Sequence, residues 1–204
     1  MLNPKLHANS HRSHPVHPTT VHFPLTFLST AYSLDTLYGL VRAYPSLPLL
    51  TRLSPLLPQL STIAYLSHFA GVVTALPSMT SGTAEFWELY KTGGINREDK
   101  LRTNPGPSGH GVVDSSVKIG MWHGILNTAA FGYSAYVAWS RWGIKEFRPT
   151  RAQVLVSALM IPGVAVSAAL GGELVYGKGV GVQRMGPALE EKLEGIKEQK
   201  KAAQ

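Results

Sequence analysis

The sequence contains no cysteine, and this absence removes several kinds of chemistry at once. The chain can form no disulfide, no cysteine-ligated zinc or iron–sulfur site, no thiolate nucleophile and no CxxCH haem attachment. The same absence leaves the redox compartment unreadable. Whatever chemistry the chain performs must therefore come from other side chains.

Charge is missing from four long stretches of the chain. These stretches hold 22, 32, 22 and 21 residues and lie between Arg12 and Asp35, Arg52 and Glu85, Lys118 and Arg141, and Arg151 and Glu173. A soluble helix carries charges on its wet face every turn or two. About 20 apolar residues, by contrast, cross about 30 Å of hydrocarbon. The pattern therefore predicts four membrane spans.

The predicted fold class is all-α, an integral membrane four-helix bundle. The spans are expected at residues 20–41, 58–79, 114–140 and 152–175. Between spans two and three, residues 83–91 place aromatic side chains among charges, which predicts a short interfacial helix in this loop, loop two. No cleavage pattern precedes span one, so we expect it to be retained.

Three segments follow from this pattern. Residues 1–16 form a flexible His-rich tail, residues 17–182 form the four-span membrane domain, and residues 183–204 form a polar C-terminal tail helix. Span two carries a seam of small residues suited to close helix contact, namely Ala64, Ser67, Gly71 and Ala75.

The net charge of +7 does not indicate nucleic-acid binding, because the basic residues are dispersed among loops and tails. The expected partner is the lipid bilayer. Thirteen Lys and Arg lie on the side of the termini and loop two, against six in loop one (residues 42–57) and loop three (residues 141–151). The positive-inside rule then predicts a multi-pass protein with both termini on the cytoplasmic side.

Ionisable and other polar residues at membrane depth are candidates for function. Antiparallel order places several of them near one membrane face, and others lie deeper. The first group is His17, His22, His123, Glu173 and Tyr176; the second is Asp35, His68 and Asn127. Two neutral histidines on facing helices can hold a haem b iron axially, and His22 and His123 are the candidates, with His17 and Glu173 as further cofactor-binding residues.

Three functions remain open from the residues alone. The favoured one is a structural or assembly component, in which polar groups only pack helices. A haem-binding or redox membrane protein with a membrane redox partner would use His22 and His123. A proton or solute carrier would use Asp35, His68 and Glu173. A structural alternative for Asp35 is an ion pair with Arg42, and no enzymatic motif is evident.

The motifs HPTTVHFPLTFLSTAYSLD, MWHGILNTAAFG and LGGELVYGKGVGV resemble the three marks of one family. This is the four-helix membrane family called domain of unknown function 2231, with HP-x-x-VHFP, a histidine followed by Leu-Asn, and GGELVY before a closing GVGV. The resemblance covers residues 17–182 and implies four spans, no established activity and an association with redox membrane proteins. A long loop two and a missing Asp-Trp pair depart from the family pattern. The matching positions are His17, Pro18, His22, Pro24, Asp35, His123, Asn127, Gly171, Gly172, Glu173, Tyr176, Gly179 and Gly181.

Overall fold

The structure is a computed structural model that describes residues 16–93, 115–177 and 180. Within these residues it is helical, with short turns between helices. The elements in chain order are α1 (Val16–Thr20), α2 (His22–Ala43), α3 (Pro48–Leu53), η2 (Ser54–Leu56), α4 (Leu57–Gly93), α6 (Ser115–Ser140), η3 (Lys145–Phe147), α7 (Arg151–Gly172) and η4 (Glu173–Gly177).

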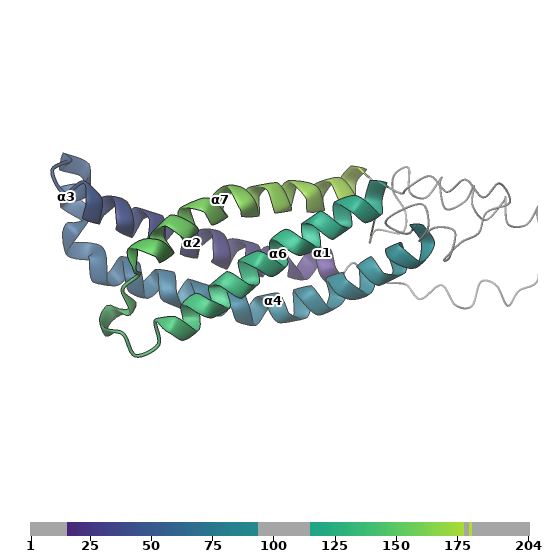
Figure 1. Cartoon of the computed structure of the whole chain (residues 1–204), viewed down its shortest axis with the longest axis horizontal. Helices are drawn as coiled ribbons and strands as arrows, with labels where there is room; N and C mark the ends of the chain where they lie inside the picture. Colours follow the sequence, from purple (N-terminus) through teal and green to yellow (C-terminus); the bar gives the residue numbers. More distant parts are fainter. Residues whose placement is uncertain (1–15, 94–114, 178–179, 181–204) are drawn as a thin grey trace, which may run out of the picture.

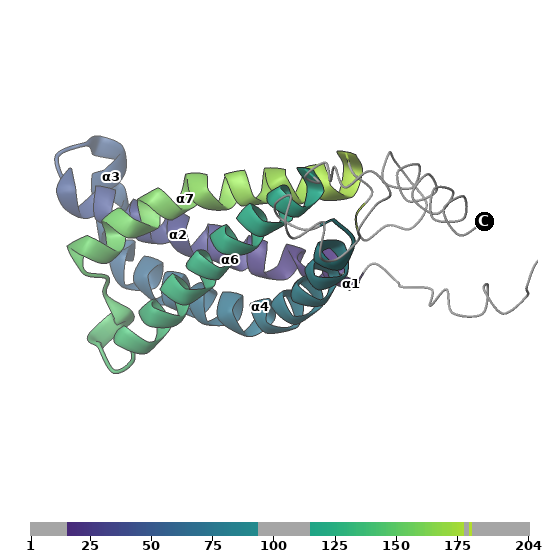
Figure 2. The same ribbon diagram turned by 45° about the vertical axis from the view of Figure 1, so that its right-hand side comes forward.

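Four long helices, α2, α4, α6 and α7, form an antiparallel bundle (Figures 1 and 2). Helix α4 packs against α2 and α6, and α7 packs against the same two helices, so neighbours in the chain are neighbours in the bundle. We call the end with α3 and η3 the loop-three end and the opposite end the α1 end. The predicted all-α four-helix bundle is confirmed.

Two predicted boundaries change. Residues 83–91 are helical as expected, but they continue α4, which runs unbroken from Leu57 to Gly93. Within α4 no proline follows Pro77, and the TAEFWELYK segment is rich in good helix formers, so nothing stops the helix at the end of span two. Helical backbone also begins at Val16, before the predicted start of span one. The predicted tail helix at 183–204 lies outside the described residues.

Two of the described helical stretches are long and apolar enough to cross a membrane. They are Pro48–Trp87, with a mean hydropathy of 1.3, and Arg151–Gly177, with a mean hydropathy of 2.1. Serine, threonine and tyrosine make up seven of the 22 residues of α2 and seven of the 26 residues of α6, against two of the 22 residues of α7, and several of these polar groups face the bundle interior.

The core is built on the predicted small-residue seam of α4. Ala64, Ser67, Gly71 and Ala75 are all buried, as expected. Gly71 lets α2 approach closely, because a Cβ at this position would collide with the Leu28 side chain. Leu28 then packs with two further buried residues, Tyr32 and Ala130, in the apolar centre of the bundle.

Candidate functional site

The carboxylate of Asp35, on α2, is the centre of a buried polar network. Asp35 is 0% exposed, and so is its partner Arg141, which follows the last residue of α6. Arg141 Nη1 donates to Asp35 Oδ1 at 2.8 Å, and Nη2 donates to Oδ2 at 2.6 Å. This is the bidentate geometry in which a guanidinium best matches a carboxylate. Each charge compensates the other, which is the condition for burying either.

The first turn of α7 orients Arg141. Thr150 and Gln153 form a capping box, in which Gln153 N donates to Thr150 Oγ1 at 3.2 Å and Thr150 N donates to Gln153 Oε1 at 2.9 Å. The same Oε1 accepts from Arg141 Nε at 3.2 Å, and Gln153 Nε2 donates to Ser140 Oγ at 2.9 Å. The motif that starts α7 therefore also holds the guanidinium.

His68, on α4, connects the ion pair to α6 and is itself 0% exposed. Its Nε2 lies 3.0 Å from Asp35 Oδ2, and its Nδ1 lies 3.0 Å from Ser134 Oγ. A carboxylate can only accept, so Nε2 carries the proton, and in a neutral ring Nδ1 accepts from the Ser134 hydroxyl. Tyr32 continues the chain, with its hydroxyl 2.8 Å from Ser134 Oγ and donating to the Ala130 carbonyl at 2.9 Å.

Helix α7 closes the network from the fourth side. Ser157 Oγ donates to Asp35 Oδ2 at 3.1 Å. The Tyr133 hydroxyl donates to the Gln153 carbonyl at 2.7 Å and lies 3.2 Å from Ser157 Oγ. The carboxylate thus accepts four hydrogen bonds, and all four long helices contribute a side chain. With His68 neutral, the network carries no net charge.

A second polar cluster lies nearer the α1 end. His17 Nδ1 donates to the Ser78 carbonyl at 2.9 Å, and His123 Nδ1 donates to the Ser167 carbonyl at 2.8 Å. Asn127 Nδ2 donates to His123 Nε2 at 3.1 Å and to the His123 carbonyl at 2.9 Å. The two imidazoles approach edge to face, with ring centroids 6.2 Å apart. Both ring nitrogens of His123 are therefore engaged.

The structure brings together only some of the candidate residues. Asp35 joins His68, and His123 joins His17 and Asn127, whereas His22 is exposed. Glu173 and Tyr176, on η4 at the end of α7, are also exposed. The Glu173 carboxylate lies against Gly177, four residues further along the chain. Among the described residues, no group of three or more His, Asp or Glu side chains could hold a metal ion.

The proposed pairing of Asp35 with Arg42 is wrong, since Asp35 pairs with Arg141 instead. Asp35 and Arg42 are seven residues apart, which is about 10 Å along a helix. Ion pairs within one helix form at spacings of three or four residues. Arg42 is exposed at the last turn of α2 and points away from the bundle interior.

Residues 13–184 match the family model described as "Predicted membrane protein", domain of unknown function 2231. The chain belongs to this family. No curated protein and no solved structure matches the chain. The family assignment therefore supports membrane residence and brings no activity with it.

Sequence reasoning about this family member missed the residues that complete the buried network. Arg141 looked like one of four basic residues of loop three, and Gln153 and Ser157 looked like ordinary residues of span four. A signal was present for Gln153, because Thr150 and Gln153 have the spacing of a capping box. No local pattern indicates that Arg141 turns inward, since this depends on where α2 places Asp35.

Proposed function

We propose that this family member is a four-span membrane protein with a structural role, in which the Asp35–Arg141–His68 network locks the four helices into one arrangement. The four-span scheme is supported by the four uncharged stretches and by the four long helices that overlap them. Hydropathy alone supports two of these spans. The excess of basic residues beside the termini favours cytoplasmic ends.

The observation that carries the structural role is the complete saturation of the Asp35 carboxylate. Both oxygens accept from Arg141, and Oδ2 also accepts from His68 and Ser157. A carrier must load and release a proton or an ion at such a group. Doing so here would leave the buried Arg141 charge uncompensated, at a cost of about 3–5 kcal/mol. A fixed ion pair between helices is the lower-energy use of these residues.

The donor set does not fit an axially ligated haem on His22 and His123. Such a haem needs one nitrogen from each histidine, pointing at a common centre. His22 is exposed, and both nitrogens of His123 already hold hydrogen bonds, to Ser167 and Asn127. Ligation through His123 would first break one of these bonds. The geometry therefore favours a packing role for His123.

Proton flux and stability, measured on the same variants, separate the structural role from transport. The native chain and Asp35→Asn are reconstituted in acid-loaded liposomes, and both are unfolded in detergent. We expect flux equal to that of protein-free vesicles for both proteins and a lower unfolding midpoint for Asp35→Asn. Glu146→Gln, at an ion pair that is partly exposed, is the matched control and should leave the midpoint nearly unchanged.

A proton flux that requires Asp35 would contradict the structural role. In that case Asp35→Asn would abolish flux while its unfolding midpoint stayed close to that of the native chain. A stable Asp35→Asn variant without proton flux would also contradict the proposal that the network holds the four helices together, because the carboxylate would then be dispensable for the fold.

A further inference from the structure

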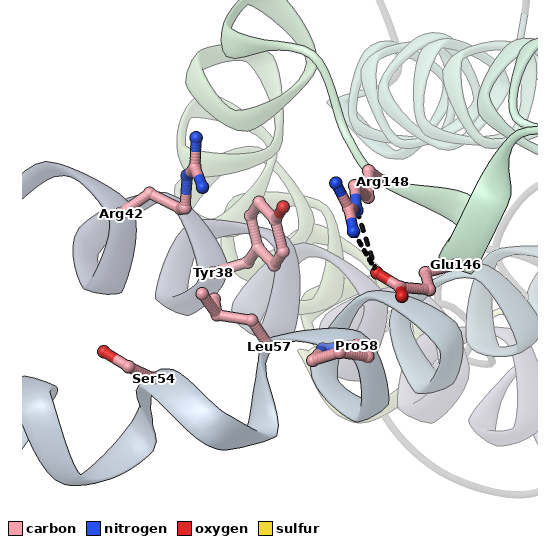
Figure 3. Close-up of a pocket in the computed structure, with 7 residues that line it drawn as sticks. All are labelled: Tyr38, Arg42, Ser54, Leu57, Pro58, Glu146 and Arg148. Atoms are coloured by element: carbon pink, nitrogen blue, oxygen red, sulfur yellow. Dashed lines mark hydrogen bonds and ion pairs between the residues drawn. The ribbon is translucent and has the colours of Figure 1, made fainter.

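A pocket of about 220 Å³ opens at the loop-three end of the bundle (Figure 3). It is too small for a drug-sized ligand, which fills roughly 300–1,000 Å³, but suits a small polar group. It is formed by the end of α2, the segment that leads into α4, and the residues around η3. The lining residues are Tyr38, Arg42, Ser54, Leu57, Pro58, Glu146 and Arg148.

The η3 side of the pocket is held rigidly. Glu146 has a left-handed backbone conformation, with φ of 58°, and its carbonyl accepts from Ser61 Oγ at 2.7 Å. The next residue, Phe147, stacks on the buried ring of Tyr65, with centroids 4.0 Å apart and planes 7° from parallel. These two contacts fix the turn against α4, so the side chains of Glu146 and Arg148 project from an ordered backbone.

The pocket presents a guanidinium group on each side of its opening (Figure 3). Arg148 donates through Nε and Nη2 to Glu146 Oε2, at 2.8 and 2.6 Å, which directs its Nη1 away from Glu146. Arg42, from the last turn of α2, stands on the other side of the opening, and the Tyr38 hydroxyl lies between the two arginines (Figure 3). Two arginines and one glutamate leave a net charge of +1 around the opening.

The surroundings place the pocket at the level of lipid headgroups. Trp139 and Trp142, at the end of α6, are 77% and 75% exposed, and Tyr44 after α2 is 55% exposed. Exposed tryptophan and tyrosine at the ends of membrane helices mark the interface between hydrocarbon and water. The chemical group available at this depth in every leaflet is the phosphodiester of a phospholipid. Guanidinium groups bind phosphate oxygens with charge-assisted hydrogen bonds.

We propose that this pocket binds the phosphate of a membrane phospholipid headgroup between Arg42 and Arg148. The Tyr38 hydroxyl supplies a further donor, and Leu57 and Pro58 form an apolar floor beside the phosphate. Glu146 orients Arg148 through one carboxylate oxygen. The proposal requires membrane residence but not a structural role for the Asp35 network, so either idea can fail without the other.

Lipid retention by the purified full-length chain tests the site. The native chain and variants are extracted from the same membranes, delipidated equally, and the bound phospholipid is counted by native mass spectrometry. Arg42→Gln and Arg148→Gln should each retain roughly tenfold less phospholipid, about the effect of one charge-assisted hydrogen bond. Arg52→Gln is the matched control, since Arg52 is an exposed arginine of α3 at the same end but outside the pocket.

Two further measurements sharpen the result. Glu146→Gln should retain at least as much phospholipid as the native chain, because the glutamine oxygen can still accept from Arg148 while a negative charge beside the phosphate is removed. An excess of inorganic phosphate should displace little lipid, because it lacks the contacts of the glycerol and acyl groups. A fall in retention for Glu146→Gln would show that the negative charge of Glu146 favours binding, which is opposite to what a phosphate site requires, and would overturn the proposal.

Three other outcomes would also overturn it. Equal losses in Arg42→Gln and Arg52→Gln would show general charge attraction at this end of the bundle. No retained phospholipid on the native chain would remove the site altogether. Full displacement by inorganic phosphate would identify a site for soluble phosphate, not for a lipid headgroup.

Discussion

The sharpest prediction concerns Arg141→Met, which removes the guanidinium and keeps a long apolar side chain. Asp35 would then be a buried carboxylate with no opposite charge, since Arg141 makes the only ion pair with an arginine or lysine that the structure records for it. Removing one partner of a buried ion pair costs about 3–5 kcal/mol. An ordinary hydrogen bond between membrane helices contributes about 0.6 kcal/mol and at most about 1.7. A buried ion pair and an ordinary interhelical hydrogen bond therefore predict losses in the free energy of unfolding that differ severalfold.

Combining Arg141→Met with Asp35→Asn should restore stability, whereas two substitutions ordinarily add their losses. Asp35→Asn alone leaves the Arg141 charge buried and uncompensated, at a similar cost of about 3–5 kcal/mol. The double variant removes both charges, and the asparagine amide can still accept from His68. Its loss is then mainly that of imperfect hydrogen bonding, about 1–3 kcal/mol. We expect the double variant to be more stable than either single variant.

Reversible unfolding in mixed detergent micelles gives the free energies for this cycle. Arg148→Met is the control, because it breaks an ion pair whose arginine side chain is 52% exposed and should cost less than about 1 kcal/mol. Additive losses in the double variant, or an Arg141→Met loss near that of the control, would refute the electrostatic lock. The network would then be a set of ordinary interhelical hydrogen bonds.

Two further predictions concern packing. Gly71→Val should lower the free energy of unfolding by about 1–3 kcal/mol, because the new side chain meets Leu28. Gly132→Ala, at an exposed position of α6 with no atom close to the new Cβ, should raise the free energy of unfolding by about 0.5–1 kcal/mol. Unfolding of both variants in detergent gives the signs, and equal effects would contradict the close approach of α2 and α4. Ser61→Ala should cost about 0.5–1.5 kcal/mol by the same measurement and speed proteolysis in loop three, since it removes the bond to the Glu146 carbonyl. Unchanged cleavage would mean that Phe147 alone fixes the turn.

The bundle could be predicted from the sequence because its signals are local. The uncharged stretches reflect the solvent around each helix, and the seam from Ala64 to Ala75 repeats at helical spacing on one helix. The capping box of Thr150 and Gln153 is likewise contained in four residues. Each of these patterns depends on neighbours in the chain, so a single sequence reveals it.

The network could be predicted only in part. Asp35 and His68 stand out in the sequence as ionisable residues at membrane depth, but their partners depend on the relative height of three helices. Arg141 lies 106 residues from Asp35, and the register between α2 and α6 follows from contacts such as Tyr32 with Ser134. A one-turn shift, about 5.4 Å, would separate the pair. No spacing within one segment contains that information.

The inward position of Arg141 also changes how the charges of loop three should be counted. The positive-inside rule acts through cations that face lipid headgroups and water. Arg141 is fully buried against Asp35, so one of the four basic residues of this loop does not face headgroups or water. The loop-three end therefore attracts the cytoplasmic leaflet less strongly than its composition suggests. This strengthens the prediction that the termini are cytoplasmic, and tags at both ends should resist protease added outside intact cells. Cleavage of either tag under those conditions would contradict this orientation.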